Sequence, residues 1–266
     1  MRIFISADIE GTCGIVDWQE ANITHESCMY HRIQMTEEVN AACKGAISCG
    51  CNYVLVKDAH ASARNIIPSK LSEVASILRG WTGDPLGMMS GLDTSFDAAI
   101  FIGYHSGATK DGNPLSHTKN SSAIDYIKIN GDLASEFVIN SYTASYYGVP
   151  VVFLSGDELL CDDAKILNPN IVTTPVSKGI GNASISINPN LAVKKIEEEV
   201  KYALSGDLDK FMVKLPENFD IEIRFKNHFK AYKASFYPGA SLKDSMSISF
   251  ESNDYMDVLK LLLFTI

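Results

Sequence analysis

The sequence lacks several features that define common protein classes. No two of its six cysteines have the Cys-x-x-Cys spacing of a zinc knuckle. No apolar run is long enough to span a bilayer, and the run Leu261–Phe264 near the C-terminus is far too short. Basic residues are outnumbered, 23 against 32, which gives a net charge of −9. Nucleic acid and anionic membranes repel such a chain, so we expect neither as a partner.

Other absences limit the cellular compartment and the types of reaction that we expect. The first apolar strand begins at Arg2, which leaves no room for a signal peptide, so we expect a cytoplasmic protein with reduced thiols. There is no P-loop, and Lys178–Gly181 lacks the third glycine of a dinucleotide fingerprint. The segment Gly103–Gly107 has the spacing of a nucleophile elbow but carries His105 where a serine hydrolase has serine.

The sequence does contain an alternation of apolar strands with helices, which predicts an α/β fold with a mostly parallel, doubly wound sheet. After about residue 176 the sequence still predicts helices and strands but has few polar groups that could converge on a site. We therefore expect a metal-binding catalytic α/β domain over residues 1–178 and a smaller C-terminal α+β lobe over residues 179–266, which is a candidate for oligomerisation. Strands are expected at Ile3–Ile5, Tyr53–Val56, Ala98–Ile102, Ile124–Ile129, Pro150–Leu154, Ile221–Phe225 and Met246–Phe250, and helices at Cys28–Cys49, Asp132–Tyr147, Pro189–Leu204 and Asp254–Phe264.

Charged and imidazole side chains follow three of the predicted strands. Asp8 and Glu10 are separated by one residue, so on an extended backbone they point to the same side. His60 and His105 follow the next two apolar strands of the first domain. In doubly wound sheets the ligand site lies beyond the carboxyl ends of the strands, so these side chains should converge. Two like charges held together favour a cation between them.

Carboxylates with imidazoles suit zinc or another first-row divalent ion. We expect Asp8 to bridge two ions, with Glu10 and His60 completing one site and His105 and Glu136 the other. Glu136 is placed one turn into the predicted helix beside apolar residues, where an unpaired carboxylate is costly. Two ions roughly 3.5–4 Å apart activate a bridging water and polarise a carbonyl or phosphoryl oxygen.

His117 lies in a polar stretch, Ser106–Ser122, that is expected to be a long functional loop. It is a candidate general acid or a donor to an oxyanion. Each residue also has a simpler interpretation. Asp8 and Glu10 fit a solvated strand end, the histidines fit hydrogen-bonded or solvated loop residues, and Glu136 suits the positive end of a helix. Only their joint occurrence at strand ends favours a metal centre.

Six ordered motifs resemble those of the M55 peptidase family, closely over residues 1–178 and loosely beyond. They are Ser6-Ala7-Asp8-Ile9-Glu10-Gly11, Met35-Thr36-Glu37-Glu38, Lys57-Asp58-Ala59-His60, Gly103-Tyr104-His105, Ser116-His117 and Gly131–Glu136. The resemblance implies a dizinc aminopeptidase that releases N-terminal D-amino acids, such as D-Ala, from short peptides by attack of a metal-bridging water. It also implies a ring-shaped homo-oligomer, a decamer. The implied metal ligands are Asp8, Glu10, His60, His105 and Glu136, and the implied catalytic residue is His117.

Two alternatives from other classes stay open at this point. A binuclear metal phosphoesterase has similar ligands, and Asp58-Ala59-His60 resembles its first motif, but no Gly-Asn-His counterpart follows. A non-catalytic metal- or peptide-binding relative would keep the pocket but catalyse no reaction.

Overall fold

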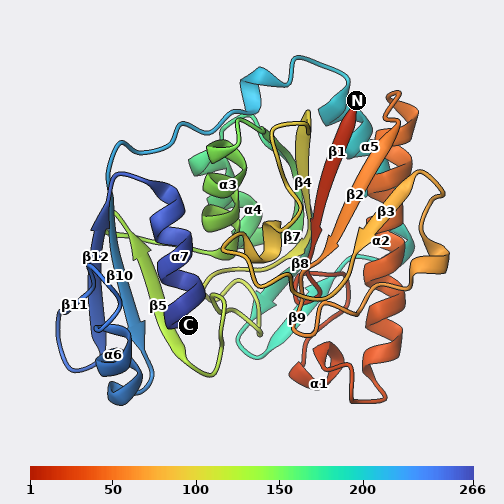
Figure 1. Cartoon of the computed structure of the whole chain (residues 1–266). Coiled ribbons are helices and arrows are strands. Elements are labelled where there is room, and N and C mark those ends of the chain that lie inside the picture. The colour runs from red at the N-terminus through yellow and green to blue at the C-terminus, as the bar shows by residue number, and fades with distance from the viewer.

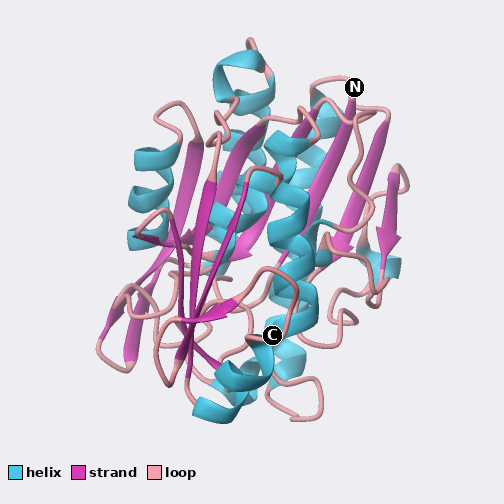
Figure 2. Ribbon diagram, turned by 60° about the vertical axis from the view of Figure 1, so that its left-hand side comes forward, coloured by secondary structure: helices cyan, strands magenta, loops and turns pink.

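The computed structural model describes residues 1–266, and its strands form two separate sheets with helices packed on them (Figures 1 and 2). The larger sheet has the strand order β3-β2-β1-β4-β7-β8-β9, and only β9 is antiparallel to its neighbour. This confirms the predicted fold class. The strands are β1 (Arg2–Ala7), β2 (Tyr53–Asp58), β3 (Ala75–Leu78), β4 (Ala98–Tyr104), β7 (Val151–Asp157), β8 (Val172–Ile180) and β9 (Ala183–Ser186).

Helices cover both faces of this sheet because its central strands are apolar on both sides. Along β1, Ile3 and Ile5 pack with helices α2 and α5, whereas Phe4 lies in the core on the opposite face, with α3 and α4. This alternation follows the two-residue period of a strand. The helices of the chain are α1 (Trp18–Ala21), α2 (Cys28–Ser48), α3 (Glu136–Tyr146), α4 (Glu158–Leu167), α5 (Pro189–Leu204), α6 (His228–Ala234) and α7 (Tyr255–Thr265). None of them is both long and apolar enough to cross a membrane.

The smaller sheet is antiparallel, with the strand order β11-β12-β10-β5-β6. Figure 1 shows it at the left, with α7 between its strands and α3. A second apolar core joins these strands to α6 and α7 and includes Ile139 of α3. The C-terminal helix α7 therefore lies on the face of the smaller sheet that is turned toward the larger sheet. The strands are β5 (Ile124–Ile129), β6 (Asp132–Leu133), β10 (Phe219–Phe225), β11 (Ser241–Leu242) and β12 (Ser247–Ser252).

The start of α3 differs from the prediction. Asp132 does not cap this helix, because Asp132 and Leu133 pair with β5 after the turn at Asn130–Gly131. Ser135 is the N-cap instead, and its side chain accepts a hydrogen bond from the Val138 N–H. Glu136 is consequently the first residue of the helix rather than one turn inside it.

The domain boundary at residue 178 stays a prediction. Segments from both sides of this boundary contribute to each sheet or to the helices packed on it. Strands β5 and β6 lie before it in the sequence but belong to the smaller sheet. Helix α5 lies after it but packs against α2 on the larger sheet. Because the chain passes between the sheets more than once, the two lobes are built from interleaved segments.

One buried carboxyl group connects α2 to the loop that follows β1. Glu38 is inaccessible to solvent, and its Oε1 accepts hydrogen bonds from the Cys13 N–H and the Gln34 side-chain amide, each at 2.9 Å. Burial raises the pKa of Glu38 from 4.5 to about 7, although both hydrogen bonds act in the opposite direction. The other oxygen, Oε2, has no partner. Ionisation of Glu38 therefore works against the folded state.

Glu38→Gln should make the protein's stability less sensitive to rising pH. The folded pKa lies above the unfolded value, so the stabilising contribution of protonated Glu38 is complete below about pH 4.5 and is lost as the pH rises through about 7. The stability lost by the wild type over this range should exceed that of Glu38→Gln by about 3 kcal/mol. Urea unfolding at pH 5 and pH 8 measures this. Partly exposed Glu37, which pairs with Lys70 at the surface, is changed to Gln as the control, and parallel pH curves for wild type and Glu38→Gln would contradict the prediction.

Candidate metal centre and cavity

Three neighbouring parallel strands deliver the first site residues to one edge of the larger sheet. Asp8 directly follows β1, His60 comes two residues after β2, and His105 directly follows β4. Strand β1 pairs in parallel with both β2 and β4, so the three strand ends lie side by side. All three side chains are buried. The predicted convergence at the strand ends is therefore present in the structure.

Two glycines allow the loop after β1 to cross the end of β4 and carry Glu10 to the same edge. A Cβ atom on Gly11 would lie 1.7 Å from the Tyr104 carbonyl oxygen, and one on Gly103 would lie 2.3 Å from the Asp8 carbonyl oxygen. Gly103 also has a φ of +68°, which residues with a side chain rarely adopt. Backbone hydrogen bonds from Asp8 N–H to Ile102 and from Gly11 N–H to Gly103 hold the crossing, each at 2.8 Å.

The remaining two residues come from the other side of the cluster. Glu136 begins α3, and His117 lies in the long loop between β4 and β5. The loop is joined to α3 by a hydrogen bond of 2.6 Å from the Lys119 backbone N–H to Glu136 Oε1. Thr118 Oγ1 also donates to the Ala134 carbonyl at 3.1 Å. The loop conformation and the position of Glu136 therefore depend on each other.

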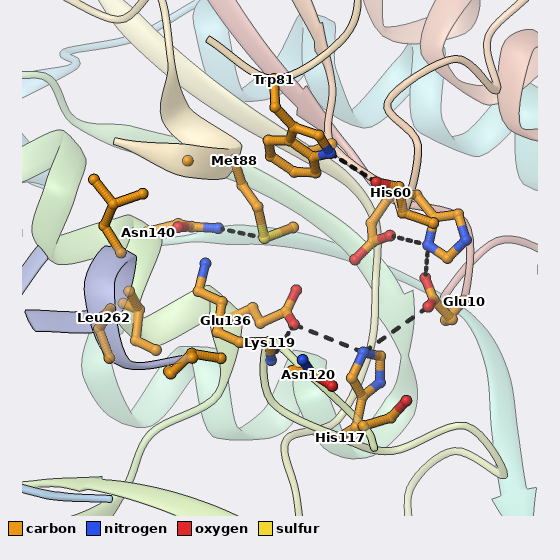
Figure 3. Close-up of a pocket in the computed structure, with 18 of the residues that line it drawn as sticks. Glu10, His60, Trp81, Met88, His117, Lys119, Asn120, Glu136, Asn140 and Leu262 are labelled. Atoms are coloured by element: carbon orange, nitrogen blue, oxygen red, sulfur yellow. Dashed lines mark hydrogen bonds and ion pairs between the residues drawn. The ribbon is translucent and has the colours of Figure 1, made fainter. Parts of the chain in front are cut away.

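The six side chains form a compact cluster of donor atoms. His60 Nδ1 lies 2.8 Å from Glu10 Oε2 and 3.3 Å from Asp8 Oδ1. His105 Nε2 lies 3.6 Å from Asp8 Oδ2 and 4.0 Å from Glu136 Oε2. His117 Nε2 lies 4.0 Å from Glu10 Oε1 and 3.9 Å from Glu136 Oε1 (Figure 3). Its ring stacks on that of His105, with the centroids 4.3 Å apart.

Backbone carbonyl groups orient all three imidazoles. His60 Nε2 faces the Ala21 carbonyl at 2.9 Å, His105 Nδ1 faces that of Ser106 at 2.9 Å, and His117 Nδ1 faces that of Leu115 at 2.8 Å. A carbonyl only accepts, so the nitrogen beside it carries the proton. The other nitrogen of each ring then presents a lone pair to the carboxylates. This arrangement is typical of metal-ligating histidines.

A cation fits between these groups. With its proton on Nε2, neutral His60 would place a lone pair 2.8 Å from a Glu10 oxygen, an arrangement that requires a proton or a metal ion between them. His105 Nε2 is buried without any hydrogen-bond partner, and buried Glu10 Oε2 has none other than this contact with His60 Nδ1. Two ligand atoms of one tetrahedral zinc, each about 2.0–2.2 Å from the ion, lie roughly 3.3 Å apart, close to the separations seen here. The donor set therefore suits zinc.

The pKa values show the same need for positive charge. Burial raises the pKa of Asp8 well above its usual range, and the charge of Glu10 adds to this. Burial also acts to raise the pKa of Glu10 and Glu136, but the charges of neighbouring histidines outweigh it and hold both below their usual values. Burial acts to lower the pKa of His60, yet Glu10 and Asp8 hold it well above its usual value. Without a metal, protonated imidazole is the cation of this site.

Three overlapping sets of donors lie close enough to share an ion. Two of them, Asp8 with Glu10 and His60, and Asp8 with His105 and Glu136, have the composition predicted for the two ion sites, with Asp8 common to both. The third combines Glu10, His105 and His117. The structure thus brings all six predicted residues together, while the role of each as ligand or catalytic group stays a prediction.

A cavity of about 740 Å³ opens beside the cluster. All of the predicted site residues except His105 line it, together with Trp81, Lys119 and Asn140. Its far wall is apolar and comes from α7. Figure 3 shows Leu262 and Asn140 on the side away from Glu10 and His60, with Lys119 and Glu136 between them. The cavity therefore lies between the two lobes.

Several supporting residues are not among the predicted site residues. Buried Asp58 accepts hydrogen bonds from the backbone N–H groups of Asn65 and Ile66, at 2.6 and 2.8 Å, and so fixes the loop after His60. Buried Asp157 accepts from the Ser106 N–H at 2.6 Å and fixes the turn after His105. Asp58 could have been found from the sequence, because it belongs to the Lys57–His60 motif. Nothing near Asp157 in the sequence connects it to His105.

Comparisons with known proteins show which family this chain resembles. The family model Peptidase_M55, described as D-aminopeptidase, matches residues 1–264. The D-aminopeptidase of Bacillus subtilis (strain 168) is 29% identical over 265 residues, which are 99% of this chain and 96% of that protein. The solved structure of the Zn-dependent D-aminopeptidase DppA from Bacillus subtilis, described as a self-compartmentalizing protease, has a TM-score of 0.91 at 29% identity. The match covers 100% of this chain and 96% of that chain.

The chain therefore belongs to the M55 peptidase family. The predicted family and the predicted hydrolase class are both confirmed, and the match extends beyond residue 178, where the sequence motifs are weak. A peptidase is favoured over the phosphoesterase considered above, because each of the matches is to a D-aminopeptidase.

Zinc should stabilise the wild-type protein, and Asp8→Asn should remove most of that effect. Zinc at about 1,000 times its Kd should raise the Tm by roughly 10 °C, because it binds the folded state only. Since burial and the charge of Glu10 destabilise ionised Asp8, the metal-free Asp8→Asn protein should be at least as stable as the wild type. Calorimetry of metal-free and zinc-loaded samples tests both parts, with Glu37→Gln as the control. An undiminished zinc response in Asp8→Asn would exclude Asp8 as a ligand.

Proposed function

We propose that this protein is a zinc-dependent aminopeptidase that hydrolyses N-terminal D-amino acids, such as D-Ala, from short peptides. The single observation that carries the proposal is the cluster of three buried carboxylates and three oriented imidazoles beside a cavity, in a chain of the M55 family. The D-aminopeptidase activity of the Bacillus subtilis relative supports the substrate class.

We further propose two ions per subunit, with Asp8 as the ligand common to both. Glu10 and His60 would complete one site, and His105 and Glu136 the other. Zinc bound at these ligands would polarise the scissile carbonyl and lower the pKa of a water that attacks it. The free amine of the substrate would bind near the metals or a carboxylate of the cluster, which would account for cleavage at the N-terminus.

His117 is the proposed catalytic residue. Its Nδ1 is committed to the Leu115 carbonyl, so its proton transfers must occur at Nε2, which faces Glu10 and Glu136. It is the most solvent-accessible of the three histidines, with 12% of its side chain exposed. Protonated Nε2 would donate a hydrogen bond to the developing oxyanion or a proton to the leaving nitrogen. Trp18 packs edge-on against the ring at 5.2 Å and limits its movement.

The zinc-loaded protein should hydrolyse D-Ala-D-Ala faster than L-Ala-L-Ala, and His117→Ala should lower kcat by roughly 10²- to 10⁴-fold. Chelation should abolish the activity of the wild type. Amino-acid release measures turnover, and elemental analysis should show the same zinc content in the variant, because the proposed ligands are intact. His228→Ala, which changes an exposed histidine of α6, is the control. No hydrolysis of any D-aminoacyl peptide by the zinc-loaded wild type would refute the peptidase assignment.

We also propose a cytoplasmic, ring-shaped homo-oligomer, a decamer, which would enclose the active sites. The description of the DppA structure as self-compartmentalizing supports an assembly. Exposed aromatic side chains support it too, since Phe229 and Tyr232 on α6 and Phe236 just after it are 57%, 58% and 70% exposed.

A decamer of the 29.1 kDa chain should have a mass in solution of about 291 kDa, ten times that of the chain. Light scattering coupled to size-exclusion chromatography measures this mass. Phe236→Asp should reduce it, because the charge would be buried in the assembly, whereas a monomeric wild type would refute the ring.

A further inference from the structure

The cavity contains one ammonium group that the proposed reaction does not use. The side chain of Lys119 lines the cavity and has neither a hydrogen bond nor a carboxylate within ion-pair distance (Figure 3). The buried Lys57 is different, because its Nζ donates to the Asp58 and Gly80 carbonyls, each at 2.7 Å. The protein therefore satisfies Lys57 internally and leaves the charge of Lys119 directed at the cavity.

The backbone of Lys119 fixes where this side chain begins. Its φ is +64°, a conformation that is unfavourable for a residue with a side chain. The hydrogen bond of 2.6 Å from its N–H to Glu136 Oε1 holds it there. The proposed metal site and the ammonium group are therefore positioned by the same residue, at a distance that the fold sets.

The surroundings of Lys119 indicate what it can bind. On one side are Asp8 and Glu136. Burial lowers the pKa of Lys119, and the charges of these two carboxylates, both beyond ion-pair distance, act to raise it. On the other side is the apolar wall of α7, with Leu259, Leu262 and Leu263. Cations bound at the cluster would neutralise its carboxylates and leave Lys119 without a matching negative charge in the cavity. A negatively charged group on the substrate is the natural partner of such a charge.

The dimensions of a peptide indicate which negatively charged group of the substrate would meet Lys119. One extended residue spans about 3.3–3.6 Å, so the C-terminal carboxylate of a dipeptide lies roughly one residue beyond the scissile bond. With the N-terminal residue at the metal cluster, that carboxylate would point toward the side of the cavity where Lys119 and α7 lie. A longer peptide would place an uncharged amide there instead.

We propose that Lys119 binds the free C-terminal carboxylate of the substrate and so makes the protein selective for dipeptides whose second residue is uncharged. This inference rests on the proposed peptidase function and adds to it the class of peptide that is cleaved. Lys119 would act in binding, through a charge-assisted hydrogen bond, and the apolar wall of α7 would receive the side chain of the second residue.

The test compares D-Ala-D-Ala with its C-terminal amide, which keeps the scissile bond and removes the negative charge. Wild type should prefer the free acid. Lys119→Gln should lower kcat/KM for the free acid by about 10- to 100-fold, mainly through KM, and should change it less than about two-fold for the amide. Lys119→Arg should restore part of the preference. Lys110→Gln removes a lysine of the same loop that pairs with Asp163 and serves as the matched control.

A binding measurement separates this role from one in the chemical step. Calorimetric titration of zinc-loaded His117→Ala protein with D-Ala-D-Ala should show a Kd that the additional change Lys119→Gln weakens by the same factor. Equal losses for acid and amide in Lys119→Gln would overturn the inference, since they would place Lys119 at the reaction centre, and so would an unchanged Kd. Failure of the wild type to hydrolyse either compound would instead overturn the proposed function.

Discussion

Three carboxyl groups, those of Asp8, Glu10 and Glu136, are buried together, and the rest of the site follows from this constraint. Each of them is at most 4% exposed. Like charges in such a setting are tolerated only where positive charge lies between them. Here the compensation comes from imidazoles whose outer nitrogens are held by backbone carbonyls, so the cluster offers its inner donors to a cation without rearrangement. The fold thus maintains a buried cluster of like charges that is energetically unfavourable until a cation binds.

The part of the site that lies at strand ends could be predicted from the sequence. Asp8, His60 and His105 each follow an apolar strand closely, and in a parallel sheet all strand ends of one direction meet at one edge. Glu136 and His117 could be named as candidates from an apolar helix segment and a polar loop, and the resemblance to the M55 family supports them, but no periodic pattern connects them to the other three. Their convergence depends on a long loop whose path is set by tertiary hydrogen bonds, and such bonds leave no local signal.

The errors and omissions arise where tertiary contacts decide between acceptable local structures. Asp132 and Ser135 are both good N-cap residues, and pairing of Asp132 with β5 selects Ser135. Helix α5 reads correctly as an amphipathic helix over Pro189–Leu204, but its sequence does not reveal that its apolar side packs on α2. Lys119 could not be found, because its exposure to the cavity depends on a left-handed backbone conformation and on a helix that begins more than 100 residues later.

The wall contributed by α7 has a consequence for how the family can diversify. The donor cluster is carried by the larger sheet and α3, whereas three leucines of the apolar lining, Leu259, Leu262 and Leu263, belong to the last helix of the chain. Substitutions in that helix can reshape the space open to a substrate while every imidazole and carboxylate stays in place. Evolution can therefore vary selectivity and reactivity separately, since the two properties are encoded in distant stretches of the gene.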